Sequence, residues 1–325
     1  MLVQIIGTLR GGGAERVALT LHKAFKRLGK HSKVYVLSEK VDYEVNDEDV
    51  VIGADVNDIK GDLIIAHMQD VSEKVDGNNV WHVIHNSYSF KFKKRNFFSR
   101  IKHIKEFRQI YNNRNLICVS NGVKKDVLQN LKVKPKEIKT IYNPFDFEEI
   151  REKANQKVDL GFDYIINAAA LTKVKNQELL IKSYARLDTP LHLVLLGKGN
   201  QEGNLKKLVK KLGLEKKVHF LGWQSNPYKY IKNAKLFVLS SNVEGFGNVL
   251  VESLALNTPV VSTNCPSGPS EILIGELAKF LAKVNDIDDL RNKIELALND
   301  YPEIKNEYIQ KFDYIEIAKE YLELV

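Results

Sequence analysis

The sequence predicts an α/β protein with two domains, each built on a parallel β-sheet that is covered by helices on both faces. Short apolar runs alternate with helical stretches along the chain, which is typical of parallel strands joined by helices. The length of 325 residues is sufficient for two domains with separate cores.

Composition narrows the class of protein. A membrane-spanning helix needs about 18 consecutive apolar residues, and the sequence contains no such run. The apolar N-terminus is followed by glycines and charges in place of a small-residue cleavage site. Cys118 and Cys265 lack the spacing of a metal site or a redox motif. We therefore expect a cytoplasmic protein that neither spans a membrane nor is secreted, with two unpaired thiols.

The first domain begins with an expected strand at 2–9, a glycine turn and a helix that ends near Leu28. The turn, from Arg10 to Glu15, contains Gly11, Gly12 and Gly13. It matches neither G-x-G-x-x-G nor G-x4-G-K-[ST], so the spacing excludes the dinucleotide and P-loop motifs. Further strands are expected at 32–37, 50–52, 62–66, 80–84 and 116–120.

Polar residues follow several of these strands, and ligands bind at the carboxyl ends of parallel strands. The residues in question are His67, His85, Asn86 and Ser120. His82 lies inside a strand, so we interpret it as structural. A histidine at a strand end also satisfies ordinary backbone groups, so a structural role for His85 stays an alternative.

The second domain is expected to begin at residue 146, after a turn that Asn143, Pro144 and Asp146 favour. Its first strand, at 164–168, is followed by a loop with Lys173 and Lys175 and by a helix from about Asn176. Two later apolar runs end in glycine, at Gly197 and at Gly222, which Trp223 follows.

The segment 236–273 carries most of the chemical information. An apolar run at 236–239 predicts a buried strand, and the loop after it contains Glu244 between small residues. A helix that starts near Gly247 and Asn248 directs the positive end of its dipole at this loop, where a phosphate would be stabilised. Glu252 lies one turn inside that helix and can reach a ribose diol. Two solvated glutamates would also explain the spacing, but the Gly-Phe-Gly between them favours a ligand site.

The sequence EGFGNVLVE, from Glu244 to Glu252, resembles the E-x7-E motif of retaining GT-B glycosyltransferases of family four. The resemblance extends over essentially the whole chain and indicates the bacterial polysaccharide or lipopolysaccharide type. It implies two Rossmann-like domains that face an interdomain cleft. It also implies that residues 311–325 return as a helix to the first domain (1–145), which leaves 146–310 as the second.

The resemblance also implies roles for single residues. Glu244 contacts the donor sugar, Glu252 binds the ribose, and His85 approaches the reacting carbon. Lys175 and Asn176 match the second half of a Gly-Arg, Lys-Asn phosphate clamp, but Ala169 and Ala170 replace the Gly-Arg, and Lys173 is the candidate for the missing charge. The predicted site therefore has three catalytic residues, ten donor-binding residues and three secondary ones: His85, Glu244 and Lys175; Gly12, Gly13, Lys173, Asn176, Gly197, Trp223, Phe246, Gly247, Asn248 and Glu252; and Ser120, Gly268 and Glu271.

By this resemblance we expect a retaining transfer of a hexose or N-acetylhexosamine from a UDP-sugar to a saccharide acceptor. No D-x-D triplet directly follows one of the expected strands, so we expect neither metal nor cofactor. Two alternatives remain open at this point. One is a nucleotide-sugar epimerase or hydrolase on the same fold, and the other is a donor-binding subunit without turnover, for which the missing Gly-Arg is the only indication.

Residues 90–108 are basic and aromatic. The stretch 91–108 has eight Lys or Arg against one Glu, and Phe97, Ile101 and Ile104 are spaced for an apolar stripe. This pattern favours an anionic membrane surface, and hence a glycolipid or lipopolysaccharide-core acceptor at the inner face of the plasma membrane. Alternatively, the stripe is core and the lysines are solvated. Nucleic acid is disfavoured, since no nucleic-acid motif accompanies the charge.

Overall fold

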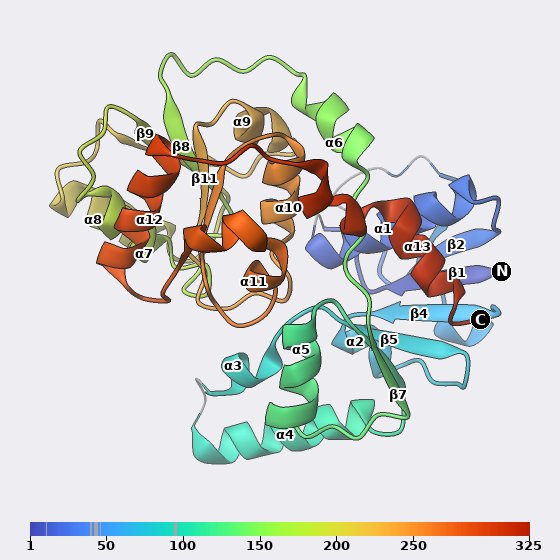
Figure 1. Ribbon diagram of the computed structural model, residues 1–325. Helices are drawn as coiled ribbons and strands as arrows, with labels where there is room; N and C mark the ends of the chain where they lie inside the picture. Colours follow the sequence, from blue (N-terminus) through green and yellow to red (C-terminus); the bar gives the residue numbers. More distant parts are fainter. Residues whose placement is uncertain (11, 40, 42–44, 46, 94–95) are drawn as a thin grey trace. The chain divides into compact units, whose positions relative to one another are not determined.

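The computed structural model describes residues 1–10, 12–39, 41, 45, 47–93 and 96–325. It divides the chain into two compact units (Figure 1), unit 1 with Met1–Asp146 and Lys311–Val325 and unit 2 with Phe147–Gln310. Each unit contains one parallel sheet with helices on it, so the predicted fold class of two Rossmann-like domains is confirmed. The cleft between the domains stays a prediction.

Unit 1 is built on a seven-stranded sheet with the order β3-β2-β1-β4-β5-β6-β7. Every residue of the three central strands is buried, because helices cover both faces. The strands are β1 (Leu2–Ile6), β2 (Ser32–Val36), β3 (Val50–Ile52), β4 (Leu63–His67), β5 (Val80–Ile84), β6 (Asn115–Cys118) and β7 (Glu137–Thr140). The helices are α1 (Gly13–Arg27), α2 (Gln69–Ser72), α3 (Tyr88–Lys93), α4 (Phe97–Tyr111), α5 (Asn121–Lys125) and α13 (Tyr314–Leu322), with a π-helical turn at Asp126–Asn130.

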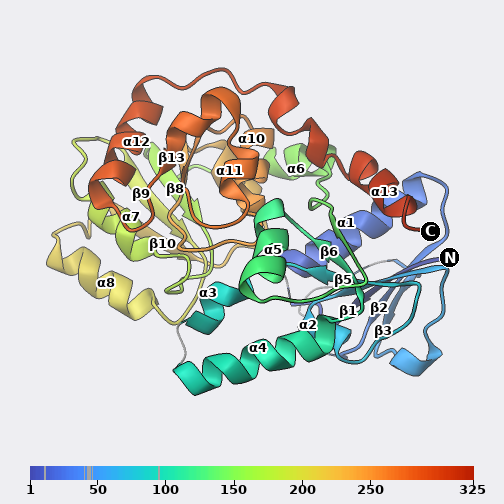
Figure 2. The same cartoon turned by 60° about the horizontal axis from the view of Figure 1, so that its bottom comes forward.

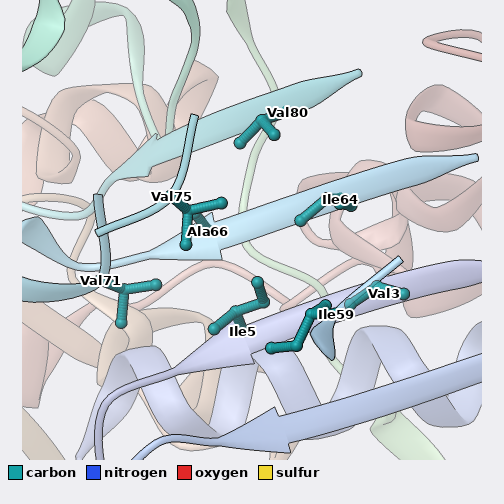
Figure 3. Close-up of a cluster of buried hydrophobic side chains, with 8 residues drawn as sticks. All are labelled: Val3, Ile5, Ile59, Ile64, Ala66, Val71, Val75 and Val80. Atoms are coloured by element: carbon teal, nitrogen blue, oxygen red, sulfur yellow. The ribbon is translucent and has the colours of Figure 1, made fainter. Parts of the chain in front are cut away.

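The core on one face of this sheet is aliphatic. Figure 3 shows side chains of β1, β4 and β5 that meet residues of the neighbouring segments. Its members are branched or small, which suits a pleated surface buried on both sides. They are Val3, Ile5, Ile59, Ile64, Ala66, Val71, Val75 and Val80.

Unit 2 is built on a six-stranded sheet with the order β10-β9-β8-β11-β12-β13. The strands are β8 (Tyr164–Ala168), β9 (His192–Leu196), β10 (Val218–Gly222), β11 (Leu236–Leu239), β12 (Val260–Thr263) and β13 (Leu281–Ala282). The helices are α6 (Phe147–Ala154), α7 (Gln177–Tyr184), α8 (Glu202–Lys211), α9 (Tyr228–Lys232), α10 (Asn248–Ala255), α11 (Pro269–Ile272) and α12 (Ile287–Asn299).

The C-terminal helix packs inside unit 1. Figure 1 shows α13 beside α1, and the two helices are in contact. The amide of Phe145 donates to Phe312 O at 2.9 Å, and the amide of Tyr314 donates to Phe145 O at 3.1 Å. Phe312 is fully buried, edge-on to the ring of Tyr142. Residues 311–325 therefore complete the core of the unit that contains the N-terminus.

Two details differ from the sequence prediction. The first strand ends at Ile6 and not at Leu9, because the chain turns at Gly7 toward the glycine turn. Strand β7 was not among the strands expected from apolar runs, since Glu137 and Lys139 give it none. It forms because it pairs with β6 at the edge of the sheet, where exposed polar side chains are tolerated.

Among the described residues, no helix is both long and apolar enough to cross a bilayer.

Phe312→Ala tests the contribution of the C-terminal segment to unit 1. We expect the free energy of unfolding to fall by about 3–5 kcal/mol, since the substitution leaves a cavity in a packed core. Urea unfolding followed by circular dichroism measures the change. Phe98→Ala, at a side chain that is 81% exposed, is the matched control and should change it by less than about 0.5 kcal/mol. Equal effects of the two variants would contradict the packing described.

Candidate functional site

The loop between β11 and α10 in unit 2 holds the E-x7-E motif. Gly247 takes a left-handed backbone conformation, with φ of 101°, and is the N-cap residue of α10. Phe246 and Glu244 are buried, at 2% and 9% exposure, although both lie in a loop. Gly268 explains part of this burial, because a Cβ atom there would overlap the carbonyl oxygen of Phe246. The loop is therefore held close to the backbone that precedes α11.

Glu244 forms an ion pair with Lys175. The lysine Nζ lies 2.7 Å from Oε1 and 2.8 Å from Oε2 of the carboxylate, and the hydroxyl of Ser241 also donates to Oε1. Lys175 follows β8 and Glu244 follows β11, and these two strands are paired in the sheet. The structure thus brings together two of the three residues predicted to be catalytic. The cation at both oxygens fixes the orientation of the carboxylate.

Hydrogen bonds join the two loops around this pair. Ser240 Oγ donates to Lys175 O at 2.9 Å, and Asn242 Nδ2 donates to Lys173 O at 2.9 Å. Asn176 caps α7, since its Oδ1 accepts from Leu179 N, and its Nδ2 donates to the side-chain oxygens of Asn242 and Asn285. The side chain of Asn176 is therefore engaged in positioning the loops.

The loop after β8 contains lysines but no arginine. Ala170 is exposed and carries no charge, and its carbonyl accepts from Gln177 Nε2 at 3.1 Å. Lys173 is exposed and has no ion pair within the part of the chain that the structure describes. Gly197 is required by packing, because a Cβ there would overlap Ala169 O. Its role as a donor-binding residue stays a prediction.

Glu252 is buried in α10, with 5% of its surface exposed. The hydroxyl of Tyr228, on α9, donates to Glu252 Oε1 at 3.4 Å. Sequence reasoning did not identify Tyr228, because its contact with Glu252 is set by tertiary packing, nor Ser241, although Ser241 lies only three residues before Glu244 in the same loop. Trp223 is 58% exposed at the end of β10, so its ring is accessible for stacking. Glu271, on α11, is half-buried.

The glycine turn of unit 1 folds around Glu15. The carboxylate accepts from Thr8 Oγ1 at 2.6 Å and from the amides of Arg10 and Gly12 at 2.7 and 2.8 Å. Sequence reasoning assigned no role to Glu15, which is 3% exposed. The amide of Gly12 is thus engaged within the turn. Gly13 is exposed as the first residue of α1, and Gly11 lies outside the described residues.

The histidine predicted to be catalytic follows β5. His85 Nε2 lies 3.0 Å from His67 Nδ1, and His67 Nε2 lies 2.7 Å from Gln4 Oε1. Burial lowers the pKa of His85 to about 4 and the pKa of His67 well below its usual value. Both rings are therefore neutral near pH 7.

Ser120, fully buried, caps α5, since its Oγ accepts from Val123 N.

His82 has the structural surroundings predicted for it. It is fully buried inside β5, and burial, followed by the charge of Arg114, lowers its pKa to about 4. Its neutral ring packs edge-on against Tyr111.

A separate group in unit 1 has metal-ligand chemistry. Atoms of His22, Asp47 and Asp49 lie within 4.8 Å of one another. However, Lys26 Nζ lies 3.0 Å from Asp47 and 2.8 Å from Asp49, so both carboxylates are already paired with an ammonium group. We assign no metal to this group.

Comparison with known proteins places the chain in a family. The family model described as "Glycosyl transferases group 1" matches residues 146–313. An N-acetylgalactosaminyltransferase of Campylobacter jejuni, whose acceptor is named as an N-acetylgalactosamine-N,N'-diacetylbacillosaminyl-diphospho-undecaprenol, is 37% identical over 210 residues, with 62% of this chain and 57% of that protein covered. A lipopolysaccharide core biosynthesis glycosyltransferase of Rhizobium meliloti is 31% identical, with 51% of this chain and 48% of that protein covered.

Solved structures agree on the fold. Anabaena HepE in complex with UDP and glucose superimposes with a TM-score of 0.77 at 18% identity, with 99% of this chain and 98% of that one covered. WaaG, a glycosyltransferase of lipopolysaccharide biosynthesis, gives 0.71 at 16% identity, with 99% and 95% covered. The chain spans 57% of the length of the Campylobacter relative and 60% of a 29%-identical glycosyltransferase of Methanocaldococcus jannaschii. The family model nevertheless matches more than half of the chain, and the protein belongs to the glycosyl transferases of group 1.

Proposed function

We propose that this protein transfers a hexose or N-acetylhexosamine from a UDP-sugar to a saccharide acceptor, with retention of anomeric configuration. We propose further that the acceptor is lipid-linked or is a lipopolysaccharide core. The observation that carries the proposal is the Lys175–Glu244 ion pair, which lies just before the N-terminus of α10. The buried Glu252 belongs to the same helix. Relatives that are named for such acceptors and the HepE complex with UDP support it.

The charges of unit 2 suit a nucleoside diphosphate sugar. Glu244 lies on the loop at the start of α10, where the sugar would be, and Glu252 lies one turn inside that helix, where it would meet the ribose. Lys175 and the positive end of the α10 dipole would stabilise the phosphate charge that develops as the sugar leaves. Lys173 is the exposed cation that would replace the arginine absent at Ala170.

Retention fits the way Glu244 is held. The carboxylate has Lys175 at both oxygens and Ser241 at one, so it is oriented for hydrogen bonds and not for attack on carbon. We propose that the acceptor hydroxyl attacks from the side of the leaving phosphate, which needs no pair of carboxylates of the hydrolase kind. In this proposal Lys175, the helix dipole and backbone amides replace a metal ion.

The proposed membrane contact is the surface of α3 and α4 (Figure 2). Phe97 and Phe98 are 68% and 81% exposed, and Ile101 is 51% exposed. Of the predicted stripe, Phe97 and Ile101 are therefore not core, whereas Ile104 is half-buried, and Phe107 and Phe92 on the same helices are buried. Exposed aromatic rings beside lysines and arginines match the interface of an anionic membrane. Lys94 and Arg95, which the sequence analysis included in this surface, lie outside the described residues.

Glu252→Gln tests the donor site. We expect the wild type to bind UDP with a chelator present and in preference to GDP and ADP. The variant should bind UDP about tenfold or more weakly, because hydrogen bonds to a charged group contribute about 1.5–3 kcal/mol. Isothermal titration calorimetry measures both.

Glu276→Gln, at an exposed glutamate of unit 2, is the matched control and should leave the UDP affinity unchanged. Absence of UDP binding in the wild type would overturn the proposed donor. Binding of UDP without sugar transfer to any acceptor would favour a donor-binding subunit over an enzyme.

Gly268→Ala tests whether the Phe246 backbone must stay in place. Gly268 and Gly213 both have positive φ, of 85° and 68°, but a Cβ meets the Phe246 backbone only at residue 268 and meets nothing within 4 Å at residue 213. Gly213→Ala should therefore cost only the about 1–2 kcal/mol of left-handed strain. We expect Gly268→Ala to lower Tm further and to weaken UDP binding, whereas Gly213→Ala leaves UDP binding intact. Similar UDP affinities for both variants would refute the coupling.

Charge reversal on α4 tests the membrane surface. Each basic residue near an anionic membrane contributes about 1 kcal/mol, so Arg100→Glu, Lys102→Glu and Lys105→Glu together should reduce binding by at least about a hundredfold. Co-sedimentation with vesicles of phosphatidylglycerol and phosphatidylethanolamine measures the binding. The control reverses Lys207, Lys210 and Lys211, all exposed on α8, and should have little effect. Equal binding of the two triple variants would exclude this surface.

A further inference from the structure

Three polar side chains form a line across the sheet of unit 1. Gln4 pairs in register with Ile65, and His67 pairs with Val83. Side chains two residues apart share one face of a strand, so Gln4, His67 and His85 lie on the same face. Each step moves one strand along the order β1-β4-β5 and two residues toward the carboxyl edge. The line therefore runs from the buried middle of the sheet to the predicted catalytic histidine.

Gln4, at the buried end of this line, determines which ring nitrogens of the two histidines carry a proton. Gln4 Oε1 has no hydrogen, so His67 Nε2 must donate to it across 2.7 Å. His67 is fully buried and its pKa is lowered, so it carries only that one N–H and its Nδ1 is an acceptor. His85 Nε2 must then donate to His67 Nδ1 across 3.0 Å. Since His85 is also neutral, its Nδ1 has no proton.

The far nitrogen of His85 is available to a ligand. His85 is half-buried, and its Nδ1 has no hydrogen-bond partner in the part of the chain that the structure describes. An unprotonated imidazole nitrogen accepts from a hydroxyl group and has nothing to donate to a phosphate oxygen. This end of the line thus accepts a hydrogen bond from a donor such as a hydroxyl group and offers none to a phosphate oxygen.

We infer that Gln4 and His67 are positioning residues that hold His85 as the Nε2–H tautomer, so that its Nδ1 accepts a hydrogen bond from a hydroxyl of the sugar substrate. The inference rests on the proposed function for the identity of the substrate, but the tautomer itself does not. If the Gln4 amide were turned around, every proton along the line would reverse and His85 Nδ1 would become a donor. The two arrangements are distinguishable in solution.

The first arm of the test measures the tautomer in the protein without substrate. Protonated and unprotonated ring nitrogens have well-separated ¹⁵N frequencies, so long-range ¹H–¹⁵N spectra of histidine-labelled protein identify each tautomer, and His85→Gln assigns the His85 signals. We expect unprotonated Nδ1 in both His67 and His85 of the wild type. Gln4→Met keeps the length of the side chain but removes the acceptor, so His85 should become a mixture of tautomers. Ile5→Val, a core change on the opposite face of β1, controls for packing and should leave the tautomer unchanged.

The second arm measures sugar transfer. Gln4→Met should reduce kcat/KM about fivefold, the net contribution of one neutral hydrogen bond, with UDP affinity unchanged. Among donors that each lack one sugar hydroxyl, one should react equally with the wild type and with Gln4→Met, because its hydroxyl is the one that Nδ1 would accept.

A proton on His85 Nδ1 in the wild type, or the same tautomer in Gln4→Met as in the wild type, would overturn the inference whatever the activity. If Gln4→Met slows every deoxygenated donor by the same factor, the hydroxyl contact is refuted. Failure of UDP to bind the wild type would instead refute the proposed function and leave the tautomer result standing.

Discussion

The ion pair between Lys175 and Glu244 is the interaction on which the predicted site of unit 2 depends. It joins the loops that follow two paired strands, β8 and β11, and it compensates a carboxylate that is 9% exposed. Removal of one partner of a buried pair leaves an uncompensated charge, which is costly. The loop would then have to open toward water. Because Phe246, the left-handed Gly247 and the start of α10 follow Glu244 directly, their positions depend on the same pair.

This pair also changes how the missing arginine is understood. Lys175 is held at its backbone by Ser240 and at its ammonium group by Glu244. Asn176 and Asn242 bridge the same two loops. Of the two predicted phosphate-binding cations, Lys175 is thus held in place and Lys173 is exposed, and preorganisation is the part of electrostatic stabilisation that costs nothing at the moment of reaction.

The sequence was sufficient for most of the fold because central parallel strands are buried on both faces. Strand β11 is a continuous apolar run, and β1, β4 and β5 are apolar except for one polar residue each, so all four are visible without a structure. Strand β7 was missed because an edge strand can be polar, and its pairing with β6 comes from tertiary structure. The motif residues of the site were found by spacing, but their partners were not. Tyr228 reaches Glu252 from another helix, and no pattern in the sequence indicates that contact.

The same limit explains why a polar residue at a strand end or turn cannot be given a role from its position alone. Gly12 and Asn176 were both predicted to bind the donor. The amide of Gly12, however, donates to Glu15. The side chain of Asn176 caps α7 and donates to two asparagines. His85 is different, because its internal partner occupies only one of its two ring nitrogens. A group with two hydrogen-bonding ends can be held by the protein at one end and still act at the other. That property makes histidine suited to the carboxyl edge of a parallel sheet, where buried core residues lie next to the region in which ligands bind.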